Sequence, residues 1–232
     1  MLALSAASGA ALIAAAAMPA TAGGRAAPRE AAPHEATEGP VSAAALLAEV
    51  RSCTRISKGK YRTDQGRRAT VPVCGKNGAV FWKADMDIDC DGRSTRACNK
   101  KTDPYFLPET AFQSSRGKPL DSAALPFVVV PGPGPLWDYR ASGIKGGGVV
   151  AVIHRNRVQY AVVGDTGPAG IIGEASYASA KALGIDPDPT SGGVASGVTY
   201  ILFKNSRVSP IESHRAAVTA GTALAREFIR KN

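Results

Sequence analysis

The alternation of apolar and polar positions predicts a chain built mostly of short strands. Runs rich in Val, Ile, Phe or Tyr, bounded by Gly, Pro and Asn, predict strands over residues 70–73, 79–83, 127–130 and 198–203. Pro and Gly alternate from Pro131 to Pro135, which excludes regular structure there and predicts a loop.

The clearest predicted element is a β-hairpin over residues 148–154 and 157–164. Both segments are rich in Val and Ile, and only Arg155 and Asn156 separate them, as a tight turn requires. Such apolar strands are typical of the middle of a sheet. The second strand runs into Asp165, which we expect at the rim of the sheet, where a Gly-rich turn begins.

Helices are predicted at three places. Ser42 can cap a short helix that reaches Val50, residues 175–183 are compatible with a helix that ends at Gly184, and residues 212–230 carry a helical apolar face. The strands do not alternate with long helices, which argues against a doubly wound sheet. We therefore expect a mostly β fold with minor helices, a small β-barrel of about six strands with a C-terminal helix.

The N-terminal region differs in composition from the rest. Residues 1–22 are apolar and uncharged and end in Ala20-Thr21-Ala22, which has the form of a signal-peptidase site, so a signal peptide is predicted. No basic residue precedes the apolar run, which leaves an uncleaved anchor as the alternative. Residues 23–40 read as a disordered linker, and residues 41–232 as the folded domain. The protein is expected to be secreted, extracellular, monomeric and not membrane-bound.

The chain has four cysteines, and an even number in an exported protein predicts two disulfides. Three connectivities are possible, and proximity in the sequence favours Cys53–Cys74 and Cys90–Cys98. No C-x-x-C is present and the three histidines are scattered, which argues against a zinc site.

The net charge of +9 comes from Lys and Arg spread along the whole chain. A nucleic-acid interface would need these residues clustered on one element with aromatic residues between them, so none is predicted. The strongest local charge feature is acidic and consists of Asp85, Asp87, Asp89 and Asp91.

Asp165 and Glu174 are the candidate catalytic pair. If the chain reverses at residues 167–170, both carboxylates come to the same end of the sheet. Two carboxylates that flank a cleft are what glycoside hydrolysis needs, since one protonates the leaving oxygen and the other activates water or attacks. The alternative is that Asp165 bonds its own turn and Glu174 stabilises a helix start.

Two blocks of the sequence resemble glycoside hydrolase family 75, the chitosanases. They are residues 162–176, which contain both carboxylates, and residues 87–92; residues 126–131 and 197–203 add weaker support. The resemblance implies hydrolysis of β-1,4-linked glucosamine polymer with inversion, without a cofactor or metal, with Asp165 and Glu174 as the essential carboxylates. Because Ile171 and Ile172 lie beside Glu174, we favour Glu174 as the acid and Asp165 as the base.

The acidic run then suggests a substrate subsite. In an extended strand Asp87, Asp89 and Asp91 point the same way, where they could pair with the ammonium groups of chitosan. Among the candidates for stacking on sugars, Trp82, Tyr105, Trp137 and Tyr139, the last two follow the Pro/Gly loop and are expected at the surface.

The acidic run has two other interpretations, a solvated loop and a calcium site. Residues 87–92 match the start of an EF-hand loop, but Cys98 occupies the position where that loop needs a bidentate Glu.

Other functions remain open at this point. Asp165-Thr166-Gly167 is also the tripeptide of aspartic proteases, although a single copy would require a dimer. A non-catalytic, calcium-dependent protein that binds cell walls or carbohydrate is a further alternative. The positive net charge would oppose association with a polycationic substrate, so the chitosanase interpretation requires a locally negative cleft on a basic body.

Overall fold

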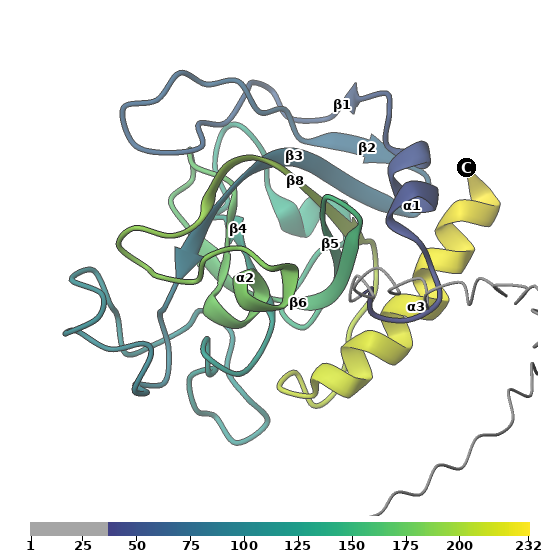
Figure 1. Cartoon of the computed structure of the whole chain (residues 1–232). Coiled ribbons are helices and arrows are strands. Elements are labelled where there is room, and N and C mark those ends of the chain that lie inside the picture. The colour runs from purple at the N-terminus through teal and green to yellow at the C-terminus, as the bar shows by residue number, and fades with distance from the viewer. Residues whose placement is uncertain (1–36) are drawn as a thin grey trace, which may run out of the picture. The chain divides into compact units, whose positions relative to one another are not determined.

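The computed structural model describes residues 37–232 of the chain (Figure 1). The signal peptide expected over residues 1–22, and the expected linker up to residue 36, lie outside the described residues. Within the described range no helix is both long and apolar enough to cross a membrane. The elements, in chain order, are α1 (Ala43–Glu49), β1 (Thr54–Arg55), β2 (Cys74–Lys76), β3 (Ala79–Asp89), β4 (Phe127–Pro131), the 3₁₀ helix η1 (Tyr139–Ser142), β5 (Val149–His154), β6 (Arg157–Gly167), β7 (Glu174–Ser176), α2 (Tyr177–Leu183), β8 (Val194–Phe203) and α3 (His214–Lys231).

Six of the strands close into a barrel. Their order is β3-β7-β4-β6-β5-β8, and pairing of β8 with β3 completes the ring. Strand pairs β3–β7 and β4–β6 are parallel, and the other four pairs are antiparallel. This arrangement confirms the mostly β fold, the barrel of six strands and the C-terminal helix, α3.

Alternation along the strands divides the buried apolar residues into two sets. One set contains Val80, Trp82, Val150, Tyr200 and Leu202. The other packs with α1 and α3 and contains Phe81, Ala151, Tyr160, Ile201 and Phe203. Because α3 lies along the outside of the barrel (Figure 1), the first set fills the interior. Asp85, Asp87 and Asp89 alternate with interior residues of β3, so they lie on its outer face.

The two outer helices begin at serine caps and pack through small residues. The hydroxyl of Ser42 accepts a hydrogen bond from the N–H of Ala45, and Ser213 does the same for Ala216. On α3 the residue that faces the ring of Tyr160 is Gly221, where a side chain would collide with that ring. The absence of a side chain there lets the long helix lie directly on β6.

The two disulfides join the predicted partners. Cys53 pairs with Cys74 and Cys90 with Cys98, with Cα–Cα distances of 5.1 and 5.0 Å. The first ties the segment after α1 to β2, and the second closes a loop directly after β3.

Several elements differ from the sequence-based expectation. Strand β3 continues to Asp89 instead of ending near Lys83, and β6 continues through Asp165 to Gly167. Glu174 begins the short strand β7 and not a helix. Residues 70–73 form no strand, and only Val71 makes a single bridge, to Tyr61. In the first three cases the extra strand residues pair with partners distant in the sequence, which local patterns do not reveal.

Glu38 attaches the N-terminal end of the described chain to the barrel. Its N–H donates to the carbonyl of Val158 (2.9 Å), and its carboxylate accepts from the N–H of Tyr160 (2.7 Å). The same carboxylate lies 3.0 Å from Nε2 of His214. The hydrogen bond to Glu38 raises the pKa of His214 above its usual value.

We predict that this ion pair stabilises the fold only at acidic pH. A histidine whose folded pKa is raised contributes stability below its unfolded pKa, and that contribution disappears as the pH rises through the folded pKa. His214→Ala should therefore lower the free energy of unfolding at pH 5.5 by less than about 1 kcal/mol, because the pair is partly exposed, and should lose this effect at pH 8.5. Thermal denaturation at the two pH values measures it. An equal loss at both would show that the imidazole acts through packing alone.

Candidate active site

Asp165 and Glu174 flank a single residue of the barrel, Val129 of β4. Val129 is paired with Asp165 of β6 on one side and with Glu174 of β7 on the other. Neighbouring strands lie about 4.8 Å apart, so the Cα atoms of Asp165 and Glu174 are separated by two spacings, roughly 9.5 Å. On its far side Glu174 is paired with Asp87 of β3. One row of residues thus carries three carboxylates across four strands.

A bulge in β6 turns Asp165 to the outside of the barrel. Val128 pairs with Val163 but Val129 pairs with Asp165, so Gly164 is the extra residue. A Cβ at position 164 would lie only 2.5 Å from Cγ of Phe127, so a glycine is required where the strand bulges. The bulge explains why an aspartate can follow an apolar strand without entering the interior.

Backbone donors orient the carboxylate of Asp165. Its Oδ1 accepts hydrogen bonds from the N–H groups of Ala111 (2.8 Å) and Thr166 (2.7 Å), and the residue is 8% exposed. Burial raises the pKa of Asp165, while these two hydrogen bonds act in the opposite direction. The two donors favour the ionised form of Asp165. Both bind Oδ1, and neither binds Oδ2.

Glu174 has a different environment. Burial raises the pKa of Glu174 to about 8, and the nearby charges of Asp87, Asp91 and Asp165 raise it further in the same direction. Within residues 37–232 its carboxyl group has no hydrogen-bond donor comparable with those on Asp165. Burial thus raises the pKa of both carboxyls, but only Asp165 has backbone donors that act against the shift. Such a difference in environment is the usual basis for dividing acid and base roles.

Further acidic residues surround a hollow of about 180 Å³ beside Glu174. Burial and the charges of Glu174 and Asp165 raise the pKa of Asp89 well above its usual value, and the pKa of Asp91 is raised to about 6, mainly by burial. Oδ1 of Asp89 accepts from the N–H of Asp91, and Oδ1 of Asp91 accepts from the N–H of Leu107, both at 2.6 Å. The hollow is lined by Ile88, Asp89, Cys90, Asp91, Asp103, Tyr105, Glu174 and Pro189.

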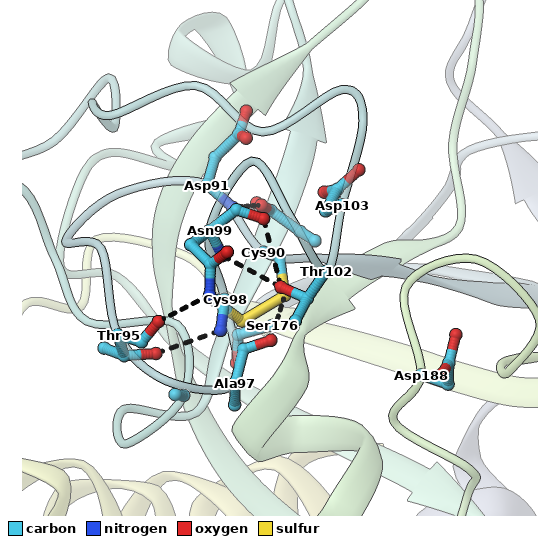
Figure 2. The surroundings of a disulfide bond; sticks show 12 residues. Cys90, Asp91, Thr95, Ala97, Cys98, Asn99, Thr102, Asp103, Ser176 and Asp188 are labelled. Atoms are coloured by element: carbon cyan, nitrogen blue, oxygen red, sulfur yellow. Dashed lines mark hydrogen bonds between the residues drawn. A yellow bond between two sulfur atoms is a disulfide. The ribbon is translucent and has the colours of Figure 1, made fainter.

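The Cys90–Cys98 disulfide holds the loop that forms one wall of this hollow (Figure 2). Asn99 and Thr102 hydrogen-bond within the loop, and Asn99 also donates to the carbonyl of Thr95 (2.8 Å). Figure 2 shows Asp91 and Asp103 beside the disulfide. The bridge therefore fixes the loop that carries Asp103 and Tyr105 against the end of β3.

The predicted aromatic subsite residues lie elsewhere. Trp137 and Tyr139 are each only 7% exposed and belong to the interior set of residues. Trp137 packs edge-on against Trp82 at 6.2 Å between ring centroids, and its Nε1 donates to Ser142. The expectation that they form an exposed pair is thus wrong, because the Pro/Gly loop directs them inward. Tyr105, in contrast, is 89% exposed and lines the hollow beside Glu174.

Sequence reasoning also left out Asp103, which lies about a dozen residues beyond the acidic run and lines the same hollow as Asp89 and Asp91. The calcium interpretation required a loop between two helices, whereas Asp87 and Asp89 lie within β3. Among the described residues, no three His, Cys, Asp or Glu side chains are grouped in a way suited to a metal ion. The carboxylates Asp165, Glu174, Asp89 and Asp91 do come together, as the sequence predicted for the first two.

Comparison with known sequences assigns the family. The model of the family described as fungal chitosanase of glycosyl hydrolase group 75 matches residues 86–230. The chain belongs to glycosyl hydrolase group 75. The matched region of this group 75 member contains Asp165, Glu174 and the end of β3 from Met86 onward.

Three relatives of this group 75 chain come from Aspergillus. An endo-chitosanase of Aspergillus oryzae (strain ATCC 42149 / RIB 40) is 33% identical over 60% of the chain, and one of Aspergillus fumigatus is 31% identical over 55%. Endo-chitosanase C of Aspergillus oryzae is 31% identical over 81%. The alignments cover 60%, 59% and 46% of the lengths of these relatives.

The crowding of carboxylates predicts a stability cost at Glu174. A carboxyl whose folded pKa is raised binds its proton more tightly in the folded state, so stability falls as the pH rises from its unfolded pKa to its folded pKa. Glu174→Gln should therefore raise the free energy of unfolding at pH 8.5 by up to a few kcal/mol, with little effect near pH 4. Thermal or denaturant unfolding at both pH values measures the difference. Glu49→Gln on α1 is the control, and the same increase in that variant, or none in Glu174→Gln, would contradict the electrostatic cause.

Proposed function

We propose that this protein hydrolyses internal β-1,4 linkages of chitosan by an inverting mechanism. The observation that carries the proposal is the pair Asp165 and Glu174, held on either side of Val129. Burial raises the pKa of both, and backbone hydrogen bonds oppose this shift at Asp165. Membership of a family described as chitosanases, and relatives named endo-chitosanases, support the substrate and the internal mode of cleavage.

Glu174 is the general acid in this proposal. With a pKa of about 8 it carries a proton at neutral pH, which it can give to the leaving glycosidic oxygen. The side chain lies among Asp87, Asp91 and Asp165, and their negative charge keeps the proton on Glu174 until the leaving oxygen accepts it.

Asp165 is the general base. The N–H groups of Ala111 and Thr166 hold its Oδ1 and favour its ionised form. A Cα separation of two strand spacings, roughly 9.5 Å, is compatible with the carboxyl separation of about 6.5–9.5 Å that leaves room for a water molecule in inverting enzymes. Asp165 would take a proton from this water as it attacks the anomeric carbon.

The acidic residues on the outer face of β3 and the following loop provide the attraction for a cationic polymer. Asp89, Asp91 and Asp103 line the hollow beside Glu174, and Asp87 is paired with Glu174 itself. Tyr105 offers an exposed ring at the same place, suited to stacking on a sugar face. This cluster is the locally negative cleft that the substrate requires on a chain with a net charge of +9.

The proposed setting is extracellular, with the protein acting as a monomer on chitosan and chito-oligosaccharides and without nucleic-acid or membrane partners. The two disulfides support an oxidising compartment.

Removing either carboxyl should abolish turnover of chitosan. We expect Asp165→Asn and Glu174→Gln each to lower kcat by about 10²–10⁴-fold, as measured by release of reducing ends from soluble chitosan. The rate of the native protein should fall on the alkaline side as Glu174 loses its proton near pH 8. Asp188→Asn, an exposed change outside the pair, is the control. Near-native rates in either folded variant would exclude that residue from the reaction.

The products should show inversion at the cleaved linkage. Because the proposed base activates water on the face opposite the leaving group, β-linked substrate should first release the α-anomer. Proton NMR of a glucosamine hexamer during the first minutes of hydrolysis distinguishes the anomers before they equilibrate. Initial release of the β-anomer would instead require Asp165 to act as a nucleophile.

A further inference from the structure

A second hollow lies beside the proposed catalytic one on the outer face of β3. It has a volume of about 280 Å³ and is lined by Thr63, Asp64, Arg67, Asp85, Asp87 and Ala195. Asp87 connects the two hollows because it lines this one and is paired with Glu174. Asp85 lies two residues before Asp87 on the same face of β3, roughly 6.6 Å away along the strand.

Asp85 is the unusual residue of this hollow. It is 5% exposed, and within residues 37–232 its buried Oδ1 has no hydrogen-bond partner. Asp165, Asp89 and Asp91 differ in this respect, since each accepts from backbone N–H groups. A buried carboxylate oxygen without a donor is costly, and a native protein retains such a group for a specific reason, such as a functional role or a bound partner.

The chain is shaped around this carboxylate. A Cβ on Gly173 would collide with Oδ1 of Asp85, and Gly173 has a φ of +113°, which favours glycine. Gly173 also accepts a hydrogen bond from the N–H of Asp87 (2.8 Å) through its carbonyl. The carboxylate of Asp85 therefore lies against the residue directly before Glu174.

The hollow is negative overall. Three of its lining residues are aspartates and one, Arg67, is cationic and exposed. Burial and the charges of Asp87 and Asp64 raise the pKa of Asp85 to about 7. A compact cation with several N–H donors in the hollow would donate to these carboxylates and offset their repulsion, which describes an ammonium group.

We propose that Asp85 binds the ammonium group of a glucosamine residue next to the cleavage site and makes the enzyme select a deacetylated sugar there. The inference rests on the proposed function. An N-acetyl group at this position offers one neutral donor and adds an acyl group beside the buried carboxylate, so an acetylated sugar should be disfavoured. Asp85 is thus a specificity residue and takes no part in the proton transfers assigned to Glu174 and Asp165.

Kinetics of Asp85→Asn test this assignment, because the change keeps the shape of the side chain and removes its charge. For fully deacetylated hexamer we expect KM to rise on the order of tenfold, the value of one charge-assisted hydrogen bond, with kcat within about twofold of the native value. The preference for fully deacetylated over partially acetylated substrate, as a ratio of kcat/KM, should fall by a similar factor. Glu49→Gln on α1 removes one negative charge far from the hollow and should change neither quantity.

Binding measurements separate this inference from the proposed function. Calorimetry with glucosamine hexamer on Glu174→Gln, with and without Asp85→Asn, reports the subsite without turnover. If adding Asp85→Asn lowers the affinity for the hexamer, the subsite is supported, even if the native protein hydrolyses nothing. A native protein without activity would overturn only the proposed function. Unchanged affinity and an unchanged preference in a folded Asp85→Asn protein would overturn the subsite. If Asp85→Asn does not fold, the same measurement is made on Asp64→Asn, which lies on the exposed rim of the hollow. We expect a loss of affinity for the hexamer of about threefold, and an unchanged affinity would contradict the assignment.

Discussion

The pairing of β7 between β3 and β4 is the constraint on which the site depends. Only three residues long, β7 places Glu174 opposite Asp87 on one side and opposite Val129 on the other. Closing the barrel in this order forces carboxylates of three strands onto one patch of its outer face. Strand pairing thus imposes a proximity that charge repulsion opposes. Burial, together with this repulsion, raises the pKa values of the site.

The fold tolerates this crowding in two ways. Most of the cleft carboxylates receive backbone donors from the long connection between β3 and β4 or from their own strand, as Leu107 does for Asp91 and Ala111 for Asp165. The Cys90–Cys98 bridge keeps the first part of that connection against the end of β3. Glu174 lacks such donors and relieves the repulsion by retaining its proton. The acid of the proposed reaction is therefore a carboxyl whose ionised form receives no stabilising backbone hydrogen bonds within the described part of the chain.

Features with a local signal could be predicted from the sequence. The hairpin of β5 and β6 has two apolar segments and a two-residue connection, α1 has the cap Ser42, and the disulfides join cysteines near each other in the chain. Asp165 and Glu174 were predicted from their spacing and from the family resemblance, and the structure places them on opposite sides of β4. The barrel followed from many strands without alternating helices.

Features set by distant contacts could not be predicted in this way. Strand β3 continues through alternating aspartates because β7 and β8 pair with it, and the bulge at Gly164 depends on the ring of Phe127. Trp137 follows a Pro/Gly loop, which indicates a surface position, but its ring packs on Trp82 of a strand far away in the sequence. Tyr105 has no local pattern that distinguishes it, and hydrogen bonds of nearby Leu107 to Asp91 and Gly92 hold its segment beside the end of β3.

The net positive charge and the acidic cleft are compatible because they act over different distances. Charges on the remaining surface are screened within about 8 Å at physiological ionic strength, whereas the carboxylates around Glu174 act on a bound sugar at contact. Under the proposed function, the ammonium groups of a bound chain would pair with Asp87 and Asp91 and remove part of the negative charge that raises the pKa of Glu174. Binding of the correct substrate would then lower that pKa from about 8 and make Glu174 a stronger acid at the moment when the leaving oxygen needs its proton. A substrate without amines would leave the proton held on Glu174, so the same crowding of carboxylates would contribute to both specificity and catalysis.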